Sequence, residues 1–345
     1  MSSDDLFSRL FELFDQSGPI NWKLAAEMMR HITDDRTPVE PDLAEEYREL
    51  ARLAEHRLTT ALEIPVHSAD LLALDRREWA ERNLEGYGYL GVAIDLRGQL
   101  PMGQLTPSLL GMQIGSMVGV MASDALASFD TGFPPDRAFS LSVVVPAVED
   151  FASATGLDAH SVRLWTVTSE LVFRSLTGPP WVVDRLTNAV NNFGDSIEID
   201  PSIFEEMQTG FDPATMSGML EGSIGETDER AELETLSASL YGRTMWVTRR
   251  LLADLIPNVD ELIERRLALR SSPETVAVSL RPLPSSMMEK GAAFWEEVAR
   301  RYGDDAVGAS HQETERLPHV DELDDPVAWA ARVLLDDLDL GDMGE

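Results

Sequence analysis

The sequence contains no cysteine, and this absence removes several kinds of chemistry at once. Disulfide bonds, thiolate zinc sites, cysteine-ligated iron–sulfur clusters and cysteine nucleophiles are all excluded. Basic residues are scarce as well, because 28 Lys and Arg stand against 61 Asp and Glu, for a net charge of −33. Nucleic-acid backbones and anionic lipid surfaces are bound by clustered positive charge, so the composition predicts neither as a partner. A solvated acidic surface is the simplest explanation, and a basic partner or a salty cytoplasm are the alternatives.

The hydrophobic and charge pattern of the sequence also predicts no targeting signal and no membrane span. The segment Met1–Phe14 begins acidic and lacks the basic start and apolar run of a signal peptide, so we expect a cytoplasmic protein. The apolar stretch 109–129 repeats glycine every four residues, at Gly111, Gly115 and Gly119, and is interrupted by Asp124. Such a stripe mediates dimers of membrane helices. With Asp124 inside it, the stretch instead predicts a buried helix whose glycine face lets another helix approach closely.

The usual site motifs are absent or lack their structural context. The histidines lie at positions 31, 56, 67, 160, 311 and 319, so none stands three or four residues from another as helical metal ligands do. There is no P-loop and no G-x-S-x-G elbow. The run Gly86–Gly91 matches G-x-G-x-x-G, but a charged helix is expected before it in place of the strand that dinucleotide binding requires. We therefore predict a flexible turn there.

The hydrophobic pattern predicts a mainly α fold of the α+β type, with many helices around one buried helix and a small β-sheet. We expect one domain over residues 1–335, with a helical N-terminal segment, residues 1–70, packed on it, and a disordered acidic tail at 336–345. The β-branched run 138–145 is the clearest strand. Helices are expected at 4–15, 22–32 with Asn21 as N-cap, 41–62, 75–84, 109–129, 162–176, 181–191, 230–255, 260–269, 286–302 and 324–335.

The central element is the helix from Val162 to Leu176, which Gly178 and the following prolines terminate. It contains the run Ser169-Glu170-Leu171-Val172-Phe173, the frame of a metallopeptidase H-E-x-x-H helix with both histidines missing. Glu170 has three candidate roles: it could support the structure, line a remnant pocket, or take part in catalysis. A buried carboxylate requires a partner, and the sequence offers Arg163 and Arg174, the latter at helical i,i+4 spacing.

Several stretches in chain order resemble one family. They are Gly18–Trp22, Gly111–Gly119, Phe129-Asp130, Val143–Pro146, Arg163–Trp165, Pro180-Trp181, Leu236–Gly242, Lys290-Gly291 with Phe294, and Leu317-Pro318 through Glu322–Pro326 to Trp329. Together they are similar to the zincin-like metallopeptidases of actinobacteria and relatives, also called the DUF2342 or coenzyme F420 biosynthesis-associated family. The resemblance implies a zincin-like fold over most of the chain.

The resemblance also implies where a zinc site would lie. Members of the family carry H-E-x-x-H, in which two histidines bind zinc and the glutamate takes a proton from the metal-bound water. Here Ser169 and Phe173 occupy the histidine positions, and Glu170 is retained. The family's further glutamate ligand corresponds to Tyr241, before Gly242. Serine and neutral phenol are poor zinc ligands and phenylalanine has no lone pair, so zinc is expected for the family and predicted absent here.

The resemblance therefore implies a catalytically inactive homologue of a zinc-dependent metallopeptidase, retained as a binding or regulatory protein whose partner is another protein or an active paralogue. We expect Phe173 and Tyr241 to lie together and to fill the space of the metal. One alternative is an active zinc-dependent hydrolase with non-standard ligands, for which His160 or Asp184 would have to approach Glu170. Another is an enzyme unrelated to zinc, with a separate acidic cleft.

Overall fold

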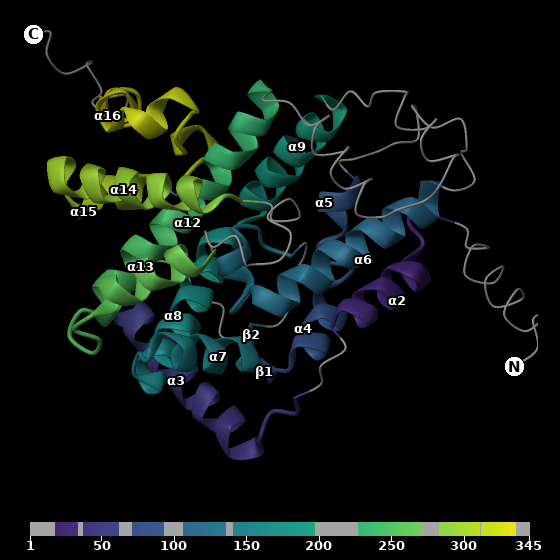
Figure 1. The fold of residues 1–345 in the computed structure, drawn as a ribbon. Helices are drawn as coiled ribbons and strands as arrows, with labels where there is room; N and C mark the ends of the chain where they lie inside the picture. Colours follow the sequence, from purple (N-terminus) through teal and green to yellow (C-terminus); the bar gives the residue numbers. More distant parts are fainter. Residues whose placement is uncertain are drawn as a thin grey trace, which may run out of the picture.

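The computed structural model describes residues 18–33, 37–61, 71–92, 106–135, 141–196, 227–270, 283–310 and 312–335. These residues form a mainly helical fold with a small sheet (Figure 1). Its helices are α2 (Trp22–Ile32), α3 (Pro41–Ala61), α4 (Arg76–Asn83), α5 (Gly88–Val92), α6 (Thr106–Asp124), α7 (Val145–Thr155), α8 (Ala159–Thr177), α9 (Pro180–Ser196), α12 (Asp228–Leu252), α13 (Val259–Arg270), α14 (Ser285–Tyr302), α15 (Asp304–Ala309) and α16 (Pro326–Leu335).

The helix α8 runs through the interior, as predicted. The side chain of Asp158 caps it by accepting the N–H of Ser161 at 2.8 Å. From Val162 to Thr177 nearly every residue is buried, which is the pattern of a helix surrounded by protein on all sides. The long helix α12 packs against it and is equally enclosed by α9 and α14. The two helices therefore form a centre against which α3, α7, α9, α13 and α14 pack, whereas α2 and α6 pack on each other and on α4.

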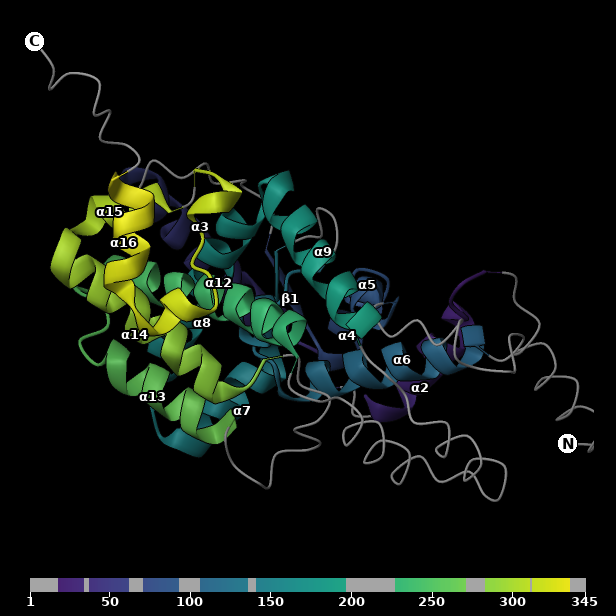
Figure 2. The same ribbon diagram turned by 90° about the horizontal axis from the view of Figure 1, so that it is seen from above.

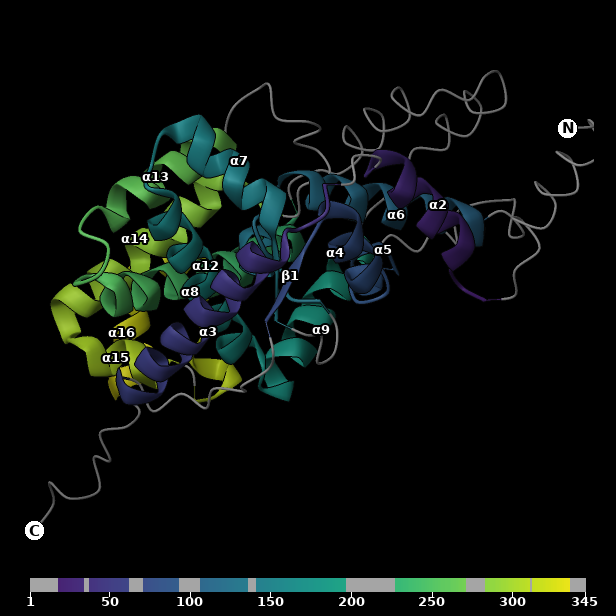
Figure 3. The ribbon, with the colours of Figure 1, turned by 90° about the horizontal axis from the view of Figure 1, so that it is seen from below.

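The glycine stripe of α6 lies against α2, as the sequence predicts. A Cβ atom at Gly115 would stand 2.2 Å from the carbonyl oxygen of Ala25, so only glycine permits this approach. Asn21 caps α2 by accepting the N–H of Leu24 at 3.0 Å. The views from above and below show α2 and α6 side by side, with α14 to α16 on the opposite side of the molecule (Figures 2 and 3). No helix among the described residues is long and apolar enough to cross a membrane.

Close backbone contact also joins α12 to α14. A Cβ atom at Gly242 would lie 2.1 Å from the carbonyl carbon of Gly291, and one at Gly291 would lie 1.9 Å from the carbonyl oxygen of Ala238. Beyond this contact, α14 and α16 share an aromatic cluster. The ring of Trp329 packs edge-on against Phe294 at 5.8 Å and Trp295 at 5.4 Å, which fastens the last helix to the core.

The sheet is smaller than the sequence suggests. Strands β1 (Leu72–Leu74) and β2 (Ser142–Val144) pair in parallel, with Leu72 opposite Ser142. The predicted strand 138–145 is wrong at its end, because Val145 already begins α7. Pro146 favours that start, since its fixed φ suits the first turn of a helix. No strand was predicted at β1, because a run of three residues is too short to show alternation.

Several predicted boundaries change in the structure. The predicted helix 109–129 ends at Asp124, and the 3₁₀ helix η2 (Ser128–Thr131) follows it. The helix 324–335 begins at Pro326, after the 3₁₀ helices η4 (Thr314–Arg316) and η5 (Asp321–Asp324). The predicted flexible turn at the glycine motif is wrong beyond Tyr87, because residues 88–91 belong to α5. No strand leads directly into the motif, and Gly88 lies directly against the ring of Trp22. The predicted helix 4–15 and the tail 336–345 lie outside the described residues.

Candidate functional site

Glu170 lies at the centre of α8 and is almost completely buried, with 1% of its surface exposed. Its Oε2 atom accepts a hydrogen bond from the backbone N–H of Phe129 at 2.9 Å. Its Oε1 atom has no hydrogen-bond partner in the described structure. The segment that carries Phe129 is held against the sheet, because Val144 donates its N–H to Leu126 at 2.8 Å and Ala127 forms a bridge with Val143. Glu170 thus fixes η2 from the helix side.

Burial raises the pKa of Glu170 to about 7, because a charged carboxylate loses its hydration in the interior. The positive charge of Arg174 and the donor groups of Phe129 and Ser128 oppose this rise. The prediction that Arg174 influences Glu170 is therefore supported. Arg163 serves other partners, since it pairs with Glu46 at 2.8 Å and Glu149 at 2.6 Å. Of the two candidate partners, Arg163 does not pair with Glu170, because it projects toward α3 and α7.

The predicted flexible turn supplies a side chain to this region. Tyr87 is fully buried, and its hydroxyl donates to the carbonyl oxygen of Phe133 at 3.3 Å and lies 3.5 Å from Thr131 Oγ1. Burial raises the pKa of Tyr87, and the negative charge of Glu170 raises it further. Tyr87, from the turn before α5, and Glu170, from α8, therefore both contact the η2 region, and the tyrosine remains a neutral hydrogen-bonding group.

A second buried carboxylate belongs to η2 itself. Asp130 is completely buried and forms an ion pair with Arg266, whose Nε donates to Oδ2 at 3.1 Å. Arg270 donates from Nη1 to the backbone oxygen of Asp130, and the N–H of Leu126 donates to Asp130 Oδ2 at 3.1 Å. Burial opposes the charge of Asp130, but the two guanidinium groups outweigh it and lower the pKa of this carboxyl. The pair is thus charged and links η2 to α13.

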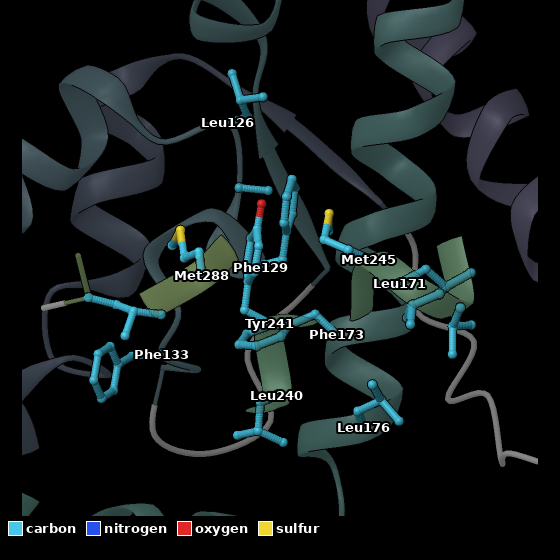
Figure 4. Close-up of a cluster of buried hydrophobic side chains, with 14 of the residues drawn as sticks. Leu126, Phe129, Phe133, Leu171, Phe173, Leu176, Leu240, Tyr241, Met245 and Met288 are labelled. Atoms are coloured by element: carbon cyan, nitrogen blue, oxygen red, sulfur yellow. The ribbon is translucent and has the colours of Figure 1, made fainter. Parts of the chain in front are cut away.

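The three positions that the family resemblance assigns to metal ligands are all in the core. Ser169, Phe173 and Tyr241 have no exposed surface. Figure 4 shows Phe173 from α8 and Tyr241 from α12 in one cluster of apolar side chains, together with Phe129, Leu171 and Met245. Neither Ser169 Oγ nor the Tyr241 hydroxyl has a hydrogen-bond partner in the described structure. Burial raises the pKa of Tyr241, and the nearby charge of Asp130 raises it further, so this phenol is neutral.

This donor set does not fit zinc. Phenylalanine offers no lone pair, and a neutral phenol and a serine hydroxyl are weak ligands beside imidazole and carboxylate. Within the described ranges, no group of three or more His, Asp or Glu side chains could hold a metal ion. His160 and Asp184 are exposed, and His160 lies 3.4 Å from Glu46, so the structure does not bring them to the buried Glu170.

Comparison with known proteins decides the ancestry of this arrangement. The sequence model of the zincin-like metallopeptidases matches residues 20–330. The chain belongs to that family. No curated protein matches it. A crystal structure from Chloroflexus aurantiacus, whose description proposes a hydrolase with a novel fold, superimposes with a TM-score of 0.65 at 18% identity. The alignment covers 91% of this chain and 98% of the other, so the two share a fold.

Several residues around the former zincin helix escaped sequence reasoning. The resemblance pointed to Phe129 and Asp130, but no role was assigned to them. Arg266 and Arg270 lie on one face of α13 at i,i+4 spacing, which is a signal for a paired function, yet it does not name the acid they bind. That acid is distant in sequence and comes close only through the packing of η2 against α12 and α13.

Proposed function

We propose that this member of the zincin-like metallopeptidase family is catalytically inactive and serves as a binding or regulatory protein. The observation that carries the proposal is the buried, zinc-incompetent set Ser169, Phe173 and Tyr241 at the expected ligand positions. A single lost imidazole would weaken a zinc site. Replacement of all three donors by two hydroxyls and a phenyl ring leaves nothing with which the metal prefers to bond.

The surroundings of Glu170 support the same proposal. A general base needs hydrogen-bond reach to the water that it deprotonates. One oxygen of Glu170 is engaged by the N–H of Phe129, and the other lies in an interior closed by aromatic and aliphatic side chains. Glu170 therefore has a conformational role, which is to hold η2 against α8.

Retention of the fold supports a role in binding. The family match extends over residues 20–330, so the sequence of the whole scaffold is retained alongside the proposed replacement of the ligands. We propose that the partner is another protein, with an active paralogue as the first candidate. Co-expression with a paralogue that has intact histidines, followed by size-exclusion chromatography with light scattering, tests this partner directly.

The decisive experiment for inactivity is a zinc measurement on the full-length protein. After loading with zinc and dialysis, elemental analysis is expected to find far less than one equivalent per chain, and a quenched-peptide library is expected to remain uncut. The matched variant S169H/F173H/Y241E restores the expected donors and should gain zinc if the assignment of the three positions is correct. Stoichiometric zinc in the wild type, with peptide hydrolysis abolished by E170Q, would refute inactivity.

One observation favours the alternative of an active hydrolase. The pKa of Glu170 is raised to about 7, which is where a general base operates best. Such an enzyme would need a route for water and substrate to a side chain with 1% exposure. The same peptide library decides between the two, and activity that survives in E170Q would assign catalysis to another region of the chain.

A further inference from the structure

Arg243 is a buried cation that meets no acid in the described structure. It lies on α12 with 3% of its surface exposed. Its Nη1 atom donates to Ser310 Oγ at 2.8 Å, and its Nη2 atom reaches the carbonyl oxygen of Gly308 at 3.5 Å. The Nε atom has no partner among the described residues. Its contacts are therefore one hydroxyl and one distant carbonyl.

This isolation is unusual for an arginine in so acidic a chain. Burying an unpaired charge costs several kcal/mol, and buried arginines normally have a carboxylate beside them. Arg266 illustrates the rule, because it is equally buried and pairs with Asp130. Burial lowers the pKa of Arg243 to about 9, with no opposing effect from a neighbouring acid. With 61 acidic residues in the sequence, none of those described neutralises this position.

The neighbouring helix end compensates the charge only in part. Gly308 lies in the last turn of α15, and Ser310 is its C-cap. The C-terminal carbonyls of a helix carry about half a negative charge at most. A separation of 3.5 Å is at the outer limit of a hydrogen bond, so the carbonyl of Gly308 is a weak partner. The positive charge of the Arg243 guanidinium is therefore only partly compensated by the end of α15.

The contacts of the guanidinium leave the hydrogen-bonding capacity of one edge largely unused. Nε and Nη2 lie along the same edge of an arginine, and this is the edge that grips two oxygens of a carboxylate or phosphate. In Arg243 the edge carries only the long contact to Gly308, whereas Ser310 occupies the other nitrogen. Nε and Nη2 of Arg243, the two donors needed for bidentate binding of an anion, thus lie side by side. The hydrogen bond from Nη1 to Ser310 Oγ fixes the position of the guanidinium.

The end of α15 offers a direction of approach. Gly308 is exposed, and a Cβ atom built on it meets nothing within 4 Å, so open space borders this turn. The acidic residues Asp304 and Asp305 lie in the first turn of α15, at its opposite end. Asp304 is paired there with Arg250 at 2.5 Å. A small anion arriving at Gly308 therefore approaches the end of α15 that is farther from these two acids.

We propose that Arg243 and Ser310 form a binding site for a small oxyanion, a phosphate group or a carboxylate, at the C-terminal end of α15. The anion takes the Nε–Nη2 edge of Arg243 in place of the carbonyl of Gly308. The hydroxyl of Ser310 remains on Nη1 and keeps the guanidinium in position. The site is separate from Ser169, Phe173 and Tyr241, so this inference does not rest on the proposed loss of zinc chemistry.

Equilibrium dialysis of the full-length protein against radiolabelled inorganic phosphate tests the site, in a chloride buffer of constant ionic strength. We expect one saturable equivalent in the wild type and a loss of affinity of about tenfold or more in R243M, which removes a charge-assisted contact. R300M, on the exposed face of α14, should bind as the wild type does. Competition by acetate would identify a carboxylate as an equally acceptable ligand, and its absence would restrict the site to phosphate.

Absence of saturable binding of both phosphate and acetate to the wild type would overturn the proposal without reference to any variant. Equal affinity in R243M and the wild type would overturn it as well, because the anion would then bind elsewhere. Circular dichroism shows whether R243M is folded. If it is not, R243K keeps the charge but cannot grip two oxygens, so it should also bind more weakly, and unchanged affinity in R243K would count against the bidentate site.

Discussion

The backbone N–H of Phe129 donates to Oε2 of Glu170 at 2.9 Å, across 41 positions of sequence. A glutamate of the central helix therefore holds the short helix η2 in place from one side, while Asp130 ties the same element to Arg266 and Arg270 from the other. The two buried carboxylates differ in their environment, because Asp130 has two cations and Glu170 has mainly Arg174. This difference leads to separate predictions for pH and for mutation.

Replacing Glu170 by glutamine should change how stability depends on pH. The pKa of Glu170 rises from its ordinary value of 4.5 to about 7 on folding, so the native state binds the proton more tightly than the unfolded state. Stability from this group is full below pH 4.5 and declines as pH rises toward 7, by about 3 kcal/mol as an upper bound. Relative to the wild type, E170Q should therefore gain stability over this interval.

Urea denaturation at a series of pH values measures the difference between the two proteins. The exposed Glu264 on α13 provides the control, since E264Q should give a curve parallel to that of the wild type. If the E170Q and wild-type curves also run parallel, Glu170 does not bind its proton preferentially in the native state.

Substituting Asp130 by asparagine should destabilise the protein strongly. The change leaves Arg266 and Arg270 buried without their counter-charge, and breaking one side of a buried pair costs about 3–5 kcal/mol. The exposed pair of Arg250 and Asp304 is the comparison, because D304N should cost less than about 1 kcal/mol. Both values come from chemical denaturation at neutral pH, and similar losses in the two variants would contradict the importance of the buried charge.

Removing the hydroxyl of Tyr241 should be harmless or stabilising. This hydroxyl is buried and has no hydrogen-bond partner among the described residues, so Y241F removes a polar group that the interior does not satisfy, with an expected gain of up to about 1 kcal/mol. Tyr47 is the matched control, because its hydroxyl donates to Glu149 at 2.9 Å. Y47F should therefore lose about 1 kcal/mol. A clear loss of stability in Y241F would show that its hydroxyl has a partner in solution.

Adding a methyl group at Gly115 should separate α2 from α6. The new Cβ would lie 2.2 Å from the carbonyl oxygen of Ala25, and relief requires movement of the whole helix because the clash is with backbone. We expect G115A to cost about 1–3 kcal/mol, or more if the helices cannot shift. In contrast, G308A meets open space and should be neutral or stabilising by up to about 1 kcal/mol, as expected for alanine in a helix. Thermal melting of both variants compares them directly.

Local patterns were sufficient for most of the helical fold. The apolar spacing of Val162 to Leu176 predicted a buried helix, and the glycine stripe predicted the close contact that α6 makes with α2. Asn21 was also predicted as the cap of α2 and is confirmed. These features are encoded by residues within a few positions of each other. The strand β1 was missed because it is not encoded locally. Its three residues form a strand only when β2, which is distant in the sequence, lies beside them.

The candidate site was predictable only where family resemblance pointed to it. The resemblance alone singled out Ser169, Phe173 and Tyr241, whereas the absence of cysteine and of paired histidines can be read directly from the sequence. Whether Glu170 is buried, and which of its oxygens has a partner, depends on the position of η2. Unlike a helix cap, a hydrogen bond to a backbone group far away in the chain has no sequence signature, because every residue except proline carries the same N–H.

By itself, the sequence determined that this protein is a mainly helical, acidic chain with a buried central helix and without any pair of histidines at helical spacing. Composition and helical period decide those features, since they depend only on which residues are present and how they are spaced. The tertiary structure alone decided that Asp130 meets two arginines, that Glu170 accepts the N–H of Phe129 in the core, and that Arg243 meets no described acid. Desolvation and Coulomb interaction depend on distance in space, and packing sets that distance between residues far apart in the chain.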